Sequence, residues 1–267
     1  MQLFSEPEPT HGAMSAEAYK NLLGRMELNF WSTFVRETIQ NSWDASKGLQ
    51  KGPVVYSANF REFKKGEWDK AFKEVFNSKV PEDIDNVDKE NQVDWKELSN
   101  ARQMLIISDR NTTGMGGPTA KQQQMSFDAS EVPADFTAFV FSWGSPQDTL
   151  LGGGTYGYGK SVLYSPSKAS TIIVHTHCLN EKGEFEKRII ACSLAHSGWT
   201  KSGKPVTGRH WWGNTKDYEG VGPVIGERAD QLASLLGFPI FPNDESTGTS
   251  IAVISPSLTD EDGNDME

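Results

Sequence analysis

The chain has 267 residues, 36% of them hydrophobic, and its 36 acidic residues outnumber 26 basic ones to give a net charge of −10. This length is sufficient for one large domain with its own core. No apolar run approaches the roughly 18 residues of a membrane span, and the acidic balance argues against direct nucleic-acid binding. The two cysteines lack CxxC spacing, which favours reduced core thiols in a cytoplasmic protein.

The first third of the chain predicts mainly helices. Residues 1–15 contain few apolar side chains, and we expect a flexible arm there. Helices are expected over 16–26 and 28–46. Apolar and polar residues alternate over 53–60, as in a strand, and the apolar residues of 66–78 recur at helical spacing.

The rest of the chain predicts mainly strands. The acidic stretch 81–97 indicates a solvated loop or a frayed helix, and the turn Asn180–Gly183 joins two strands as a hairpin. The further expected elements are strands at 103–108, 170–178, 186–196 and 249–255 and a helix at 226–236.

We therefore expect one domain over 16–256, with a helical and acidic insertion at about 62–100 and a disordered acidic tail at 257–267. The elements lack a regular βαβ alternation, which favours an α+β fold.

One candidate site lies on the helix predicted at 28–46. Glu37, Asn41 and Asp44 fall on one stripe of this helix. A carboxylate can take a proton from water, and an amide oxygen is a suitable Mg²⁺ ligand. The alternative is an ordinary amphipathic helix with a solvated face. The opposite stripe is apolar and is expected to pack on a sheet; it consists of Trp31, Val35, Ile39 and Trp43.

A second candidate is the acid that ends the strand at 103–108. Asp109 is followed closely by Gly114, Met115, Gly116 and Gly117. Such a carboxylate can accept the exocyclic amine of adenine, and glycines let the backbone approach a flat ring. The alternative is an Asx-type turn after a strand.

A third candidate is the glycine-rich segment 152–161. Its backbone N–H groups and Lys160 could bind phosphate at a helix start. Gly154 to Ser161 also matches the P-loop pattern GxxxxGK[ST]. A P-loop follows a hydrophobic strand, however, whereas residues 145–152 indicate a loop, so this interpretation is the less favoured one.

These motifs, in this order and with Gly248-Thr249 before the last strand, resemble those of the GHKL ATPase superfamily. That superfamily includes gyrase B subunits, MutL-type proteins, large heat-shock chaperones, histidine kinases and MORC proteins. The first motif is Glu37-x-x-x-Asn41-x-x-Asp44-Ala45, and the third is most similar to the MORC lid, although one residue is missing before Lys160. In the second, Asp109 and Gly114-Met115 stand one residue further apart than usual.

The resemblance implies a Bergerat-type two-layer sandwich, with a mixed, mostly antiparallel sheet and helices on one face. It implies ATP and Mg²⁺ as ligands, with Glu37 as general base and Asn41 on the metal. Asp109 would bind adenine with support from Thr249, while Met115 lies against the base. Further implied contacts come from Asp44, Ala45 and Gly114 and from the lid residues Gly154, Tyr156, Gly157, Gly159, Lys160 and Ser161.

We therefore expect a slow ATPase whose lid closure couples to homodimerisation or partner assembly. Many relatives place a lysine from a second domain on the γ-phosphate. Here Lys160 or a partner protein would supply it. The alternative function is an ATP-sensing switch that does not hydrolyse ATP. A role in bacterial or antiviral defence or in DNA maintenance is a guess by analogy.

Two other clusters are not assigned a function. His175 and His177 share one face of a strand and Cys178 the other, so we do not expect a zinc site from this run alone. The aromatic run 209–213 is a candidate for a partner surface, and a core edge is the alternative.

Overall fold

The computed structural model describes residues 1–9, 30–46, 52–82, 93–120, 134–142 and 162–258. The strands are β1 (Gln2–Pro7), β2 (Val55–Glu62), β3 (Gln103–Arg110), β4 (Thr171–Leu179), β5 (Phe185–Leu194), β6 (Gly198–Trp199), β7 (Pro205–Gly213), β8 (Val224–Ile225) and β9 (Gly248–Ile254). The helices are α2 (Phe30–Asp44), α3 (Glu67–Phe76), α4 (Trp95–Ser99), α6 (Asp135–Phe141) and α8 (Glu227–Leu236).

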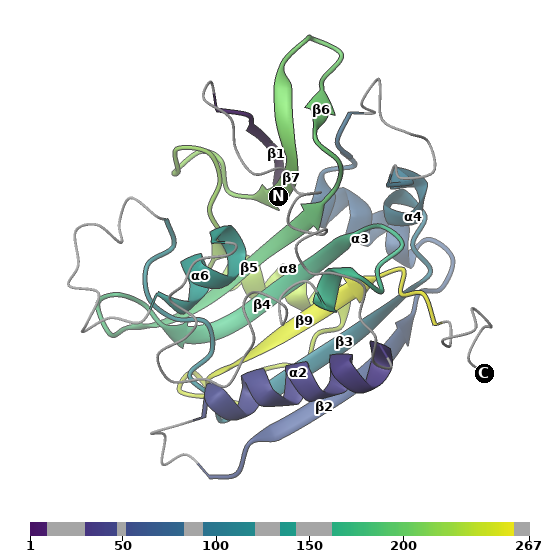
Figure 1. The fold of residues 1–267 in the computed structure, drawn as a ribbon. Coiled ribbons are helices and arrows are strands. Elements are labelled where there is room, and N and C mark those ends of the chain that lie inside the picture. Colours follow the sequence, from purple (N-terminus) through teal and green to yellow (C-terminus); the bar gives the residue numbers. More distant parts are fainter. Residues whose placement is uncertain (10–29, 47–51, 83–92, 121–133, 143–161, 259–267) are drawn as a thin grey trace.

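One nine-stranded sheet forms the centre of the molecule (Figure 1). Its main path runs β1-β7-β5-β4-β9-β3-β2, with β6 beside β7 and β8 beside β5. All of the described strand pairs are antiparallel. The expected α+β class with a mostly antiparallel sheet is therefore confirmed.

Helices cover both faces of the sheet. Met104 and Ile106 of β3 belong to the same apolar cluster as α3 and α8, whereas Leu105 and Ile107 belong to the cluster that contains residues of α2 and α6. Figure 1 shows α2 and α6 in front of the sheet and α3 and α8 behind it. The prediction of helices on one face is therefore wrong. The central strands are apolar at successive positions, so both faces require cover.

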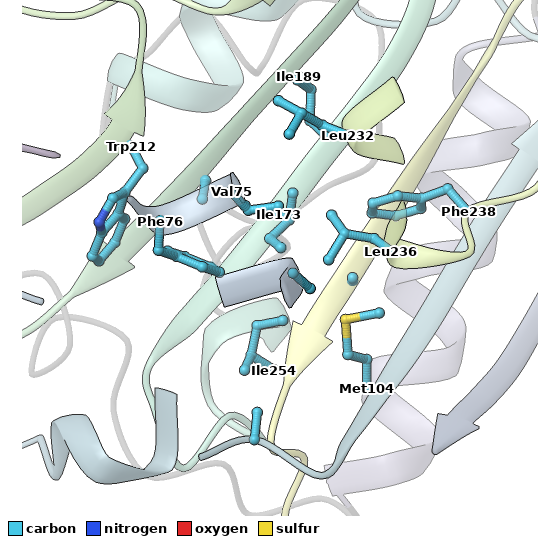
Figure 2. Packing of buried hydrophobic residues seen from close by; sticks show 14 of the residues in the cluster. Val75, Phe76, Met104, Ile173, Ile189, Trp212, Leu232, Leu236, Phe238 and Ile254 are labelled. Carbon is cyan, nitrogen blue, oxygen red and sulfur yellow. The ribbon is translucent and has the colours of Figure 1, made fainter. Parts of the chain in front are cut away.

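The cluster behind the sheet contains residues of α3, α4 and α8 together with residues of the central strands. Figure 2 shows Phe76 of α3 and Leu236 of α8 near Ile173 of β4. These side chains are fully buried, and Phe76 also packs edge-on against Trp212 at 5.1 Å between ring centroids. This cluster fixes the rear of the sheet on which the candidate site is built.

The N-terminal segment differs from its prediction. Residues 2–7 form β1, which pairs with β7 at one end of the sheet. Glu6 accepts a hydrogen bond from Thr207 at 2.8 Å and lies 3.3 Å from Arg209. This part of the expected flexible arm is therefore an ordered strand, because β7 pairs with its backbone. Residues 10–15, the helix expected at 16–26, and 259–267 of the acidic tail lie outside the described residues.

Residues 209–213 lie within β7, and Trp211 and Trp212 are buried, one on each face of the sheet. Of the two interpretations, the structure supports the core and not the partner surface. The insertion expected at about 62–100 contains α3 and α4, while residues 83–92 lie outside the described ranges.

Candidate functional site

Asp109 lies at the junction of β3, α2 and β9. Its Oδ1 accepts hydrogen bonds from the backbone N–H of Thr249, at 3.0 Å, and from the hydroxyl of Thr112. Its Oδ2 accepts a hydrogen bond from the hydroxyl of Ser42, at 3.1 Å. A carboxylate offers about four acceptor positions, so these three donors from the described residues leave one position for a further donor.

The electrostatics of Asp109 reflect two opposing effects. Burial raises the pKa of its carboxyl group above the ordinary value, while the hydrogen bonds from Thr112, Thr249 and Ser42 act in the opposite direction. Burial disfavours the charged form, and hydrogen bonds to the carboxylate favour it. A carboxylate held in this way is pre-oriented toward a donor.

The face of helix α2 that packs on the sheet is not the most hydrophobic face of the helix. The buried residues are Phe34, Thr38 and Ser42. Of the stripe predicted to pack on the sheet, Val35, Ile39 and Trp43 are exposed, so that prediction is wrong; only Trp31 packs partly against the core.

Helix α2 can bury Thr38 and Ser42 because their hydroxyl groups have hydrogen-bond partners. Thr38 Oγ1 lies 2.8 Å from the Phe34 carbonyl oxygen and 2.8 Å from the Tyr56 hydroxyl. Ser42 bonds to the Thr38 carbonyl as well as to Asp109. A satisfied hydroxyl costs little to bury.

The predicted motif residues of α2 extend from its middle, at Glu37, to its C-terminal end, at Asp44. Glu37 forms an ion pair with Arg36 at 3.0 Å, and Asn41, one turn further along, is exposed. Asp44 accepts a hydrogen bond from Gln40 at 3.0 Å. The carbonyl of Ala45 accepts a hydrogen bond from Thr113 N–H at 2.8 Å, which ties the end of the helix to the loop after β3.

Loop 111–120, which contains the second motif, is fixed by β4. Met115 N–H donates to Thr176 Oγ1 at 2.8 Å, and Thr176 Oγ1 also bonds to Gly248 and lies 3.2 Å from Thr249 Oγ1. Gly114 has φ of +66°, and a Cβ there would lie 2.5 Å from the carbonyl oxygen of His177. The structure therefore requires glycine at this position.

A buried arginine also holds this loop. Arg188 of β5 is fully buried, donates to the Gly117 carbonyl at 2.7 Å and to the Met115 carbonyl at 3.4 Å, and pairs with Glu186 at 2.6 Å. Its guanidinium also lies over Phe136. It positions the loop from behind and was not predicted from the sequence.

The structure thus brings together Asp109, Thr249, Gly114, Met115 and the end of α2. Gly154, Tyr156, Gly157, Gly159, Lys160 and Ser161 lie outside the described residues, so both the lid and the P-loop interpretations remain predictions.

Four residues that contribute to the site were missed: Ser42, Thr112, Thr176 and Arg188. The hydroxyls of Thr38 and Ser42, one turn apart on α2, were a readable signal for a polar inner stripe. No sequence pattern marked Thr112, Thr176 or Arg188.

His175 and His177 lie on the α8 side of β4, as the alternation predicts. The His177 ring lies 5.1 Å from that of Phe241, and His175 Nε2 lies 3.6 Å from Asp230. Cys178 points to the other face, toward Gly116. Within the described ranges, no group of three or more His, Cys, Asp or Glu side chains could hold a metal ion.

No protein-family model and no curated protein matches this sequence. Over the part of the chain that the structure describes, the longest and most apolar helices are too short and too polar to cross a bilayer.

Proposed function

We propose that this chain binds ATP with Mg²⁺, between α2, loop 111–120 and β9, and hydrolyses it. The observation that carries the proposal is Asp109: a largely buried carboxylate with three fixed donors and one acceptor position left. A purely structural aspartate in an Asx-type turn needs no partners from two other elements.

An adenine base suits this acceptor. Adenine presents an exocyclic amine donor where guanine presents a carbonyl acceptor. A carboxylate at this point therefore favours ATP over GTP. Met115 lies in the loop that would border the base, and its side chain packs partly against the apolar cluster that contains residues of α2 and α6.

The chemistry would come from Glu37 and Asn41. They lie one turn apart on the same side of α2, so their side chains are neighbours. The Asn41 amide oxygen would bind Mg²⁺, which shields phosphate charge. Glu37 would accept the proton of the attacking water; its ion pair with Arg36 occupies Oε1 only. Gly154, Tyr156, Gly157, Gly159, Lys160 and Ser161 would close over the phosphates.

The alternative is an ATP-sensing switch that does not turn over. Glu37 favours hydrolysis, because a pure sensor has no use for a base at this position. Lid closure would couple to association with a second copy or with a protein partner in the cytoplasm.

Calorimetry with a non-hydrolysable ATP analogue, with and without Mg²⁺, tests the proposal. Asp109→Asn should weaken binding by about 10- to 100-fold, because a bond to a charged group contributes about 1.5–3 kcal/mol. Asp69→Asn, on α3 behind the sheet, is the matched control and should bind normally. Equal affinities for ATP and GTP analogues, or no binding by the wild-type chain, would refute the assignment.

A further inference from the structure

Large apolar side chains are exposed together on α2 and β2. Val35, Ile39 and Trp43 of α2 and Phe60 of β2 are between 45% and 62% exposed, and Phe60 lies on the same face of β2 as Tyr56. Figure 1 shows α2 lying along the same end of the sheet as β2, and Thr38 contacts Tyr56 between them. A concentration of this kind marks an interaction surface.

The two ends of the sheet are built differently. β1, at one end, contains Pro7 and a register shift between Ser5 and Pro7, both of which discourage further pairing. β2, at the other end, pairs with β3 without a shift over eight residues and contains neither Pro nor Lys. Among the described strands, β2 has a partner on one side only. Its outer edge therefore lacks the features that protect β1.

The direction of the backbone groups at this edge follows from one bond. Phe63 N–H donates to the Arg102 carbonyl at 2.8 Å, directly after β2. In an antiparallel pair, alternate residues point both backbone groups toward the partner strand. The odd-numbered residues of β2 therefore face β3, and Tyr56, Ala58 and Phe60 present N–H and C=O groups at the outer edge.

We propose that two copies of this chain associate through β2, with their outer edges paired antiparallel about a twofold axis at Ala58. The small Ala58 side chains meet at the axis. Tyr56 of each copy then lies opposite Phe60 of the other, on the face covered by α2. Aromatic cross-strand pairs of this kind stabilise a sheet.

The charges at the edge permit this pairing although each copy carries a net charge of −10. β2 contains one Arg and one Glu. In this register Arg61 lies opposite Val55, so no like charges face each other. The exposed stripe of α2 is on the opposite side of the helix from Glu37 and Asn41. The interface and the proposed nucleotide site therefore use different surfaces. Association through β2 should not require ATP, unlike the association proposed to accompany lid closure.

A disulfide tests the register. Opposed residues in a hydrogen-bonded antiparallel pair have Cα atoms about 5.5 Å apart, within the range that a disulfide spans. Cys178 and Cys192 are buried, and burial raises the pKa of each thiol to about 12, so they will not compete. Ala58→Cys should therefore form a covalent dimer under mild oxidation without nucleotide, and Trp199→Cys, at another exposed position on β6, should not.

Sedimentation equilibrium without nucleotide tests the association itself. The wild-type chain should be a dimer, and Phe60→Lys should raise the dissociation constant at least tenfold. Trp199→Lys is the matched control, because Trp199 is 55% exposed and Phe60 53%.

Three results would overturn the proposal. One is a wild-type chain that stays monomeric at high concentration. Another is equal cross-linking of Ala58→Cys and Trp199→Cys. The third is a monomer whose Ala58 and Phe60 amides are protected from hydrogen exchange, since a segment of the same chain would then cover the edge. Failure of ATP binding would leave all these measurements unaffected.

Discussion

The hydroxyl of Ser42 donates to Oδ2 of Asp109, and this bond joins the helix that carries Glu37 and Asn41 to the strand that carries the buried acid. A second connection, from Thr113 N–H to the Ala45 carbonyl, lies close by. Together they set the position of the end of α2 relative to loop 111–120. Asp109 and the helix that carries Glu37 and Asn41 are therefore held in a fixed relation to each other.

Ser42→Ala should destabilise the chain and weaken ATP binding. It leaves a buried carboxylate oxygen without its donor, which costs about 1–3 kcal/mol. Ser46→Ala removes a half-buried hydroxyl that bonds to the Trp43 carbonyl within the same helix end, and should change little. Urea unfolding and calorimetry of both variants measure the difference. Equal stability of the two would show that the Ser42–Asp109 bond contributes nothing.

Glu37→Gln should bind ATP but turn it over about 10²- to 10⁴-fold more slowly, as expected on loss of a general base. Arg36→Gln removes the ion pair and keeps the carboxylate, so it should retain activity. Phosphate release under single-turnover conditions separates the two. Full activity of Glu37→Gln would place the base elsewhere, and an inactive wild type that binds ATP would favour the switch.

Arg188→Met should loosen loop 111–120, because the carbonyls of Gly117 and Met115 lose their donor. Removing one partner of a buried ion pair costs about 3–5 kcal/mol. Lys187→Met is the neighbouring control; Lys187 pairs with Asp230 behind the sheet. Hydrogen exchange should rise across the loop only in Arg188→Met. A Lys187→Met variant that loosens the loop equally would argue for a general loss of stability.

Gly114→Ala should weaken nucleotide binding more than Gly183→Ala. Both glycines have positive φ, +66° and +77°, so the backbone strain is similar. A Cβ at Gly114 would meet the His177 carbonyl oxygen at 2.5 Å, whereas nothing lies within 4 Å at Gly183. Thermal unfolding and calorimetry of the two variants isolate the steric effect. Equal melting temperatures and equal nucleotide affinities would contradict the clash at Gly114.

The stability of the chain should fall as the pH drops below 6.5. Burial lowers the pKa of His210 to about 3, so the native state stays neutral there while the unfolded chain takes up a proton. The unfolding free energy then decreases by about 1.4 kcal/mol per pH unit for this residue until the pH reaches about 3. His210→Gln should reduce the slope measured by urea unfolding by about half a proton at pH 6.5, rising to nearly one proton at about pH 5. An unchanged slope would mean that His210 titrates normally.

The pKa of Asp109 is shifted in the opposite direction from that of His210. Because the pKa of Asp109 is raised above its ordinary value of 3.8, its carboxylate is lost at a higher pH than in the unfolded chain. Nucleotide affinity should therefore decline on acidification before an ordinary aspartate would titrate. Calorimetry from pH 7 downward measures this, and Asp109→Asn should show no such decline.

Local sequence patterns predicted most strands but not which strands pair with each other. The alternation at 53–60 and the apolar runs at 103–108 and 249–255 identified β2, β3 and β9, because period and turn signals are local. The prediction of a flexible arm was wrong for residues 2–7, since β1 is ordered by β7, about 200 residues away in the sequence. Propensity cannot detect such a partner.

The site was only partly predictable for a related reason. Glu37, Asn41 and Asp109 were found by their spacing. The inner face of α2 was missed because Ile39 and Trp43 are more hydrophobic than Thr38 and Ser42. The two hydroxyl groups are buried instead, because they form hydrogen bonds with Tyr56 and Asp109.

The position of β9 between β3 and β4 has a consequence for biosynthesis. Of the described strands, β9 emerges last from the ribosome, and it lies inside the sheet between β3 and β4. Until it is inserted, β3 and β4 cannot be joined, and Asp109 lacks the N–H of Thr249, 140 residues downstream. Such long-range closure makes folding slow. The nascent chain should therefore reach a ligand-competent form only after residue 254 has left the exit tunnel, and until then it would depend on protection from chaperones.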